Sequence, residues 1–128
     1  MARVLLVDDE PMLRSALRQY LEFSGHTVQE ARDGDDALSV ARSNLPDIVV
    51  SDVLMPIRDG LSLCREMRAD AALARVPFLF ITARSTRTDL YEEMAHIGDG
   101  CVVKPFEPDD LVATIDRVIA QGSNAKGR

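Results

Sequence analysis

The chain is poor in the residues that build disulfide-rich or membrane-spanning proteins. Its 128 residues include no tryptophan, two tyrosines and two cysteines. Two cysteines, Cys64 and Cys101, make neither a disulfide framework nor a four-cysteine zinc site, so we expect both to be reduced thiols. No apolar run reaches the roughly 18 residues of a membrane span, and no signal-peptide pattern begins the chain. These absences predict a cytoplasmic protein that does not bind membranes.

Positive charge is also scarce, with a formal net charge of −6. Proteins hold nucleic acid largely by neutralising phosphates with Lys and Arg, so we expect no direct nucleic-acid binding by this chain. The length favours one domain, and a hydrophobic content of 46% is enough to fill its core. We expect the domain to cover residues 1–121 and the polar run 122–128 to be a flexible tail.

Short apolar runs alternate with segments of helical periodicity, which is typical of a parallel α/β fold. Strands are expected at residues 3–7, 27–31, 48–51, 78–81 and 101–103. Helices are expected between Pro11 and Gly25, over 34–43, 60–70 and 85–94, and from Pro108 to the start of the tail.

Polar residues stand where four of these strands end. Asp8 and Asp9 follow the first strand, Asp52 the third, Thr82 the fourth, and Lys104 the fifth. The carboxyl ends of parallel strands form one edge of a sheet, and ligands bind in the crevice there. These five side chains are therefore expected to face one small volume, which would suit a divalent cation and a phosphoryl group.

The sequence resembles the receiver domains of two-component response regulators, from Val4 to about Gln121. The resemblance implies a flavodoxin-like fold with one doubly wound, five-stranded parallel sheet in the order 2-1-3-4-5. It rests on motifs in the right order: Val7-Asp8-Asp9-Glu10-Pro11, Pro46-Asp47-Ile48-Val49-Val50-Ser51-Asp52, Met55-Pro56, Asp59-Gly60-Leu61, Thr82-Ala83 and Lys104-Pro105-Phe106.

The resemblance also implies a function. Asp52 would accept a phosphoryl group from a histidine kinase or a histidine phosphotransfer protein. The domain would then switch conformation to control a downstream protein target, as a signalling module rather than an enzyme. We expect it to be a monomer or a weak dimer.

The same resemblance implies a metal site. Its protein ligands would be Asp8, Asp9, Asp52 and the backbone carbonyl of Leu54, with Asp9 binding directly and Asp8 mostly through a water. Hard oxygen ligands suit Mg²⁺ or Mn²⁺. A carboxylate needs such a cation to approach a phosphorus atom that is surrounded by negative oxygens.

Three further residues would hold the phosphoryl group. The Thr82 hydroxyl and the Ala83 N–H would each reach a phosphoryl oxygen, and Lys104 would neutralise the added charge. Thr82 would be the sensor of phosphorylation, because its hydroxyl moves towards the new group. The Lys104–Pro105 peptide bond would be cis, a form that is inexpensive only before proline.

The chain departs from the family pattern at four positions. Cys101 stands where the family usually has Tyr or Phe, so either the output surface differs or the coupling runs through the backbone and the fourth helix. A redox-sensitive thiol at Cys101 would need a lowered pKa. Arg58 either tunes the acidic site or points to solvent. Leu54 and Arg84 are expected to slow hydrolysis of the phosphoryl group.

Several alternatives stay open. The expected form is a stand-alone receiver, and the alternative is the receiver module of a longer regulator, such as one that binds DNA. A phosphatase with an aspartyl nucleophile is disfavoured, because Leu54 stands where such enzymes carry their acid/base Asp. His26 and His96 are expected to be exposed or in loops.

Overall fold

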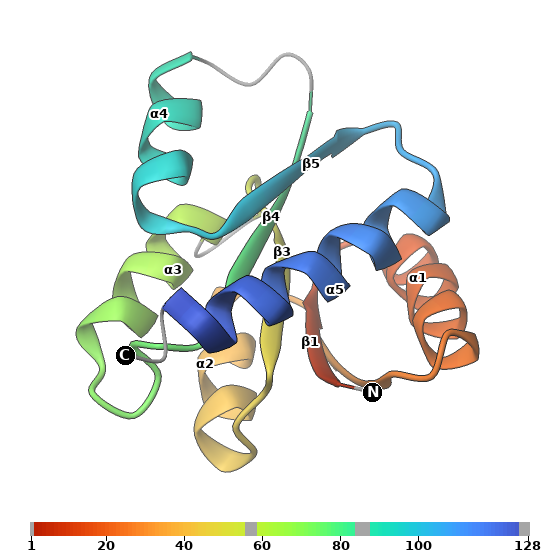
Figure 1. The fold of residues 1–128 in the computed structure, drawn as a ribbon, viewed down its shortest axis with the longest axis horizontal. Helices are drawn as coiled ribbons and strands as arrows, with labels where there is room; N and C mark the ends of the chain where they lie inside the picture. Colours follow the sequence, from red (N-terminus) through yellow and green to blue (C-terminus); the bar gives the residue numbers. More distant parts are fainter. Residues whose placement is uncertain (1, 56–58, 84–87, 126–128) are drawn as a thin grey trace.

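The computed structural model describes residues 2–55, 59–83 and 88–125, with side chains as far as 121. Within these ranges five strands alternate with five helices (Figure 1). They are β1 (Arg3–Val7), α1 (Pro11–Phe23), β2 (Thr27–Ala31), α2 (Gly34–Ser43), β3 (Ile48–Asp52), α3 (Gly60–Ala69), β4 (Phe78–Ala83), α4 (Thr88–Ile97), β5 (Gly100–Lys104) and α5 (Pro108–Ala125).

The strands form one parallel sheet in the order β2-β1-β3-β4-β5. This confirms the expected doubly wound α/β fold. All five residues of the central strand β3 are buried, as expected for a strand that is covered on both faces.

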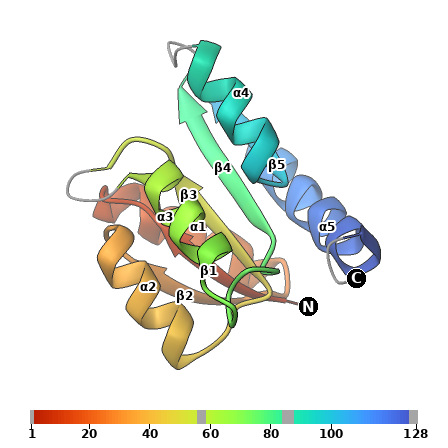
Figure 2. The ribbon, with the colours of Figure 1, turned by 90° about the vertical axis from the view of Figure 1, so that its left-hand side faces the viewer.

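Helices cover both faces of the sheet (Figure 2), and an apolar layer lies between them and the sheet on each face. On one face, α1 and α5 pack through Leu17, Leu21, Leu111, Ile115 and Val118. On the other face, α2, α3 and α4 pack over a layer that includes Leu38, Leu63, Met67, Phe80 and Met94. Because both faces are covered, the carboxyl edge of the sheet is where strand-end side chains can meet a ligand.

Local chemistry explains how the first three helices begin. Pro11 begins α1, where a missing N–H costs nothing. Asp33 and Asp59 cap α2 and α3 by accepting hydrogen bonds from the N–H groups of Asp36 and Ser62, each over 2.8 Å.

Two helices extend beyond their expected ends. α4 continues to Ile97, three residues past the expected end, and the Gly98 N–H still donates to the Met94 carbonyl over 2.8 Å. α5 continues to Ala125, into the segment expected as a tail. Gly and Ser disfavour a helix interior by no more than about 1 kcal/mol each, so residues 122 and 123 do not forbid the extra turn.

His26 lies in the loop between α1 and β2, as one of its two expected placements had it, but its side chain is buried and not exposed. Its Nδ1 accepts a hydrogen bond from the Ala2 N–H over 3.1 Å, and its Nε2 lies 3.3 Å from Asp116 of α5. The imidazole therefore joins the chain start to α5, a contact across 90 residues of sequence that local pattern does not reveal. No helix in the described part of the chain is long and apolar enough to cross a membrane.

Candidate functional site

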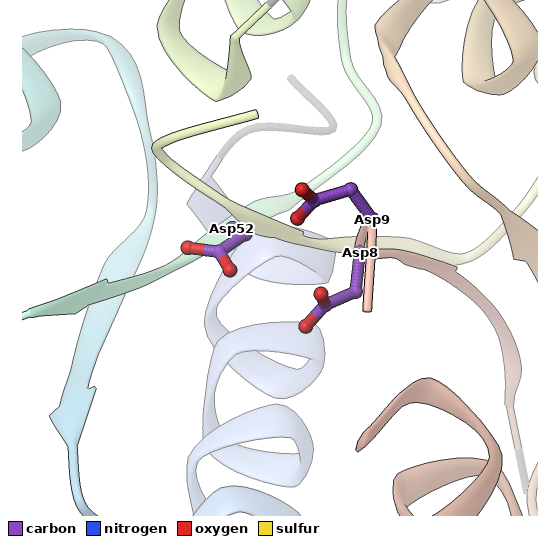
Figure 3. Close-up of side chains that lie close together, drawn as sticks. All are labelled: Asp8, Asp9 and Asp52. Carbon is purple, nitrogen blue, oxygen red and sulfur yellow. The ribbon is translucent and has the colours of Figure 1, made fainter. Parts of the chain in front are cut away.

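Three carboxylates meet at the carboxyl edge of the sheet (Figure 3). Asp8 and Asp9 follow β1, and Asp52 is the last residue of β3. One oxygen from each of the three lies within 4.8 Å of the other two. The fold thus brings together residues that are more than 40 positions apart in the sequence.

Asp8 is fully buried, and its two oxygens differ. Oδ1 accepts a hydrogen bond from the Glu10 N–H over 2.9 Å, whereas Oδ2 is buried without a hydrogen-bond partner. Burial raises the pKa of Asp8 above its usual range, and the charges of Asp52 and Asp9 act in the same direction. The Glu10 N–H and Lys104 oppose this rise without cancelling it.

The unpartnered oxygen of Asp8 fits a cation site. A buried carboxylate oxygen without a partner costs free energy, and a hard cation is the partner that oxygen-rich clusters accommodate best. Asp9 is exposed and can turn towards the same point, whereas the Asp52 side chain is only 12% exposed.

Lys104 is paired with Asp52. Its Nζ lies 3.0 Å from Asp52 Oδ2, and its side chain is 29% exposed. Partial burial alone would lower the pKa of Lys104, but the hydrogen bond to Asp52 and the charges of Asp52, Asp8 and Glu10 outweigh that effect and raise it. Lys104 is therefore a fixed positive charge beside a site whose three carboxylates and one ammonium sum to −2.

Gly60 holds the chain close behind Asp52. The Gly60 N–H donates to the Val53 carbonyl over 2.8 Å. A Cβ at position 60 would lie 2.3 Å from the Asp52 carbonyl oxygen, so only glycine allows this approach. Leu54, two residues after Asp52, has 64% of its surface exposed to solvent. A side chain this open is a weak barrier to water, which does not favour the expected role of Leu54 in slowing hydrolysis.

Thr82 and Ala83 end β4 next to this cluster. Thr82 is buried, and its Oγ1 lies 3.4 Å from the Ala83 carbonyl oxygen. Ala83 pairs in register with Lys104 on β5, and the Lys104–Pro105 bond is cis. The hydroxyl, the ammonium and the Asp52 carboxylate therefore lie on three adjacent strands.

Cys101, which departs from the family pattern, is exposed on β5. Although the residue is exposed, desolvation of its thiol raises the pKa of Cys101. A reactive thiolate needs a lowered pKa, so this environment does not favour the redox alternative. Arg58 and Arg84 lie outside the described residues.

Sequence reasoning missed one residue that supports the site. Arg14 of α1 donates from Nη1 to the Asp8 carbonyl oxygen over 2.6 Å, and its Nε is 2.8 Å from Glu30 on β2. The hydrogen bonds to Arg18 and Arg14 lower the pKa of Glu30, so this pair stays ionised. No motif marks Arg14. Its place on the first turn of the helix after the acidic pair is the only signal that the sequence carries.

Comparison with known proteins identifies the family of the chain. Residues 4–116 match the family model described as the response regulator receiver domain. The chain belongs to this family, the signalling modules of two-component systems.

Similar proteins include both longer regulators and single receivers. The chain is 36% identical over 125 residues to the response regulator MprA of Mycobacterium sp. (strain KMS), and this match covers 98% of the chain and 54% of MprA. It is 37% identical to the probable transcriptional regulator ycf27 of Guillardia theta, over 96% of the chain and 47% of that protein. The chain thus spans about half the length of these curated relatives.

Solved structures show the same arrangement. The chemotaxis protein CheY4 of Vibrio cholerae matches with a TM-score of 0.85 and 33% identity, over 92% of this chain and 98% of CheY4. A putative response regulator from Chloroflexus aurantiacus matches with a TM-score of 0.86 and 31% identity, over 93% and 98% of the two chains.

Proposed function

We propose that this domain takes a phosphoryl group from the phosphohistidine of a histidine kinase, or of a histidine phosphotransfer protein, onto Asp52. The observation that carries the proposal is the meeting of Asp8, Asp9 and Asp52 within 4.8 Å, with Lys104 paired to Asp52. A strand-end carboxylate with an adjacent ammonium, in a crevice that suits a hard cation, matches the needs of phosphoryl transfer.

The chemistry is a simple exchange of bonds. A carboxylate oxygen of Asp52 forms a bond to phosphorus as the phosphorus–nitrogen bond to histidine breaks, and the imidazole keeps the electron pair of that bond. Asp8, Asp9, Asp52 and the Leu54 carbonyl would hold Mg²⁺ or Mn²⁺, which when bound neutralises charge on the phosphoryl oxygens. Lys104 already lies against Asp52 and would stay beside the new group. The Thr82 hydroxyl and the Ala83 N–H would turn towards its oxygens.

Intact-mass measurement tests the proposal. The chain is incubated with Mg²⁺ and acetyl phosphate, beside the Asp52→Asn variant as the matched control. A gain of about 80 Da in the parent alone, the mass of one phosphoryl group, places the modification on Asp52. No gain in a parent that binds Mg²⁺ would contradict the proposal, and an equal gain in both proteins would move the acceptor elsewhere.

The step that follows phosphorylation is proposed to be an interaction with another protein or domain. A phosphorylated receiver acts by presenting a changed surface to a protein target, either a separate partner or a domain of a longer regulator. The greater length of MprA and ycf27 supports the second form, and the match with CheY4 over 98% of its chain supports the first. We propose a cytoplasmic location on the basis of the two free cysteines.

A further inference from the structure

We propose that Tyr91 of α4 is the aromatic residue that couples the phosphorylation site to the α4 surface of this protein. The inference rests on the proposed function and adds to it the route by which the signal leaves the site. It starts from the hydrogen bond that joins α4 to the end of β4, beside the proposed phosphorylation site.

Tyr91 makes a direct bond from α4 to the end of β4. Its hydroxyl donates to the Ala83 carbonyl oxygen over 3.2 Å, and its half-buried ring packs against the layer that contains Phe80 and Met94. The Thr82 hydroxyl approaches the same carbonyl oxygen, at 3.4 Å. One acceptor is therefore shared by the proposed sensor of phosphorylation and by α4.

A movement at the site would reach this acceptor. The Ala83 N–H is a proposed donor to the phosphoryl group, and the same residue carries the carbonyl that Tyr91 holds. If Thr82 and Ala83 turn towards a phosphoryl oxygen, the carbonyl is displaced and the hydrogen bond of Tyr91 lengthens or breaks. A population shift requires a contact that differs between the unphosphorylated and phosphorylated states. The hydrogen bond from Tyr91 would be such a contact, and it lies within one residue of the site.

α4 is the element of the described structure on which such a change has most effect. Of its ten residues, only Met94 is buried, and Figure 1 shows the helix at one end of the molecule, across from the carboxyl end of β4. A helix with few buried apolar contacts opens locally at low cost. The bond from Tyr91 to Ala83 is then one of the contacts that hold its first turns in place, beside the packing of Leu90 against the core.

Hydrogen exchange of α4 tests this role with the Tyr91→Phe variant, which keeps the ring and removes the hydroxyl. In the parent, Mg²⁺ with acetyl phosphate should make the amides of residues 88–97 exchange about fivefold faster, the factor that corresponds to one hydrogen bond of about 1 kcal/mol. In Tyr91→Phe these amides should exchange at the faster rate without phosphate and change no further on phosphorylation. The gain in mass at Asp52 should be the same in both proteins.

Tyr20→Phe is the matched control, because Tyr20 is the other tyrosine of the chain and its hydroxyl bonds to Asp109 on α5. This variant should keep the phosphorylation response of α4.

The outcomes separate the two proposals, because mass and exchange are measured on the same samples. A parent that gains the phosphoryl group without any change at α4, or a Tyr91→Phe variant that responds like the parent, would overturn the role of Tyr91 and leave the proposed function standing. A parent that binds Mg²⁺ but gains no phosphoryl group would overturn the proposed function, and the coupling role with it.

Discussion

At the scale of single residues, the buried carboxylate of Asp8 gives the site an electrostatic cost. Asp8 is buried, one of its oxygens has no partner, and its pKa is raised. Such a group destabilises the fold when it is ionised. A cation, or loss of the charge, would relieve the cost.

The first prediction concerns Asp8→Asn. Asparagine keeps the shape and can still accept the Glu10 N–H, so without metal this variant should be more stable than the parent by about 1–3 kcal/mol at pH 7. Thermal melts in EDTA measure the difference. In excess Mg²⁺ the order should reverse, because the variant has lost a ligand charge. A variant that is less stable than the parent in EDTA would contradict the electrostatic account.

The second prediction follows from the raised pKa of Asp8. A carboxyl group whose pKa is higher in the folded state binds protons more readily there, so its contribution makes the fold less stable as pH rises. The change begins near the ordinary value of 3.8 and is complete above the raised folded value. In EDTA, the stability advantage of Asp8→Asn over the parent should therefore shrink as pH is lowered towards 4. An advantage that is constant from pH 7 to pH 4 would exclude Asp8 as its source.

At the scale of elements, the site depends on how closely loops approach strands. Gly60 brings the start of α3 against the Asp52 carbonyl, and Arg14 ties α1 to the Asp8 carbonyl. In each contact a helix meets a backbone carbonyl that precedes it by only a few residues, across the loop that leads into the helix. Periodicity and motifs predicted the helices themselves, but they carry no information about these distances.

The third prediction is for Gly60→Ala. The added methyl group would lie 2.3 Å from a backbone oxygen, which cannot move aside as a flexible side chain does. The loop after β3 must shift, at a cost of about 1–3 kcal/mol, and the Mg²⁺-dependent rise in melting temperature should weaken.

Gly100→Ala is its control, because a methyl group there meets the ends of the Leu79 and Val118 side chains at 3.1 and 3.3 Å. The control should lose less stability and keep its response to Mg²⁺. Equal responses in the two variants would remove Gly60 from the account of the site.

The fourth prediction concerns Arg68 near the end of α3. This residue binds the last residue of α4 and the segment just before β4. Its guanidinium donates to the carbonyls of Ala74, Val76 and Ile97 and pairs with Asp99 over 2.9 Å. The Asp99 side chain is only 7% exposed, so Arg68→Met removes a largely buried ion pair together with three hydrogen bonds to carbonyls, and it should cost about 3 kcal/mol.

Denaturant unfolding checks this value against Arg42→Met, which removes the exposed partner of Asp70. The control should change stability by no more than about 1 kcal/mol. Equal losses of stability in the two variants would show that the contacts of Arg68 contribute no more than an exposed ion pair.

At the scale of the whole molecule, the sequence predicted most of the fold but not the contacts between residues that are far apart in the chain. Alternation of apolar runs and helical segments predicted all five strands and a parallel sheet, and the resemblance to receiver domains implied the strand order. The local signal is strong at β3, whose five residues are all buried. Strand ends then placed Asp8, Asp9, Asp52, Thr82 and Lys104 on one edge.

Other features were beyond sequence reasoning because they depend on partners far along the chain. His26 is buried by contacts to Ala2 and Asp116, and Tyr91 reaches a carbonyl on another element. The sequence also did not predict where α4 and α5 end. Helix propensity is a weak signal that tertiary contacts override, so it does not fix the last residue of a helix.

The fifth prediction is that divalent cations stabilise the entire domain. A ligand that binds only the folded state adds about 2.7 kcal/mol when present at 100 times its dissociation constant. Melting temperature in excess Mg²⁺ should therefore exceed that in EDTA by several degrees. Glu92→Gln, which removes an exposed charge on α4, should keep the full shift. Coincident melts of the parent in EDTA and in Mg²⁺ would exclude the metal site.

The doubly wound order has a consequence for how the chain becomes competent during its synthesis. The acidic pair after β1 leaves the ribosome early, yet Lys104 ends the last strand of the sheet, and Asp52 pairs with it only after β4 has come between them. A nascent or truncated chain that lacks β5 therefore has acidic groups but no complete acceptor. Under the proposed function, a chain would therefore become able to accept a phosphoryl group only after its last strand has joined the sheet.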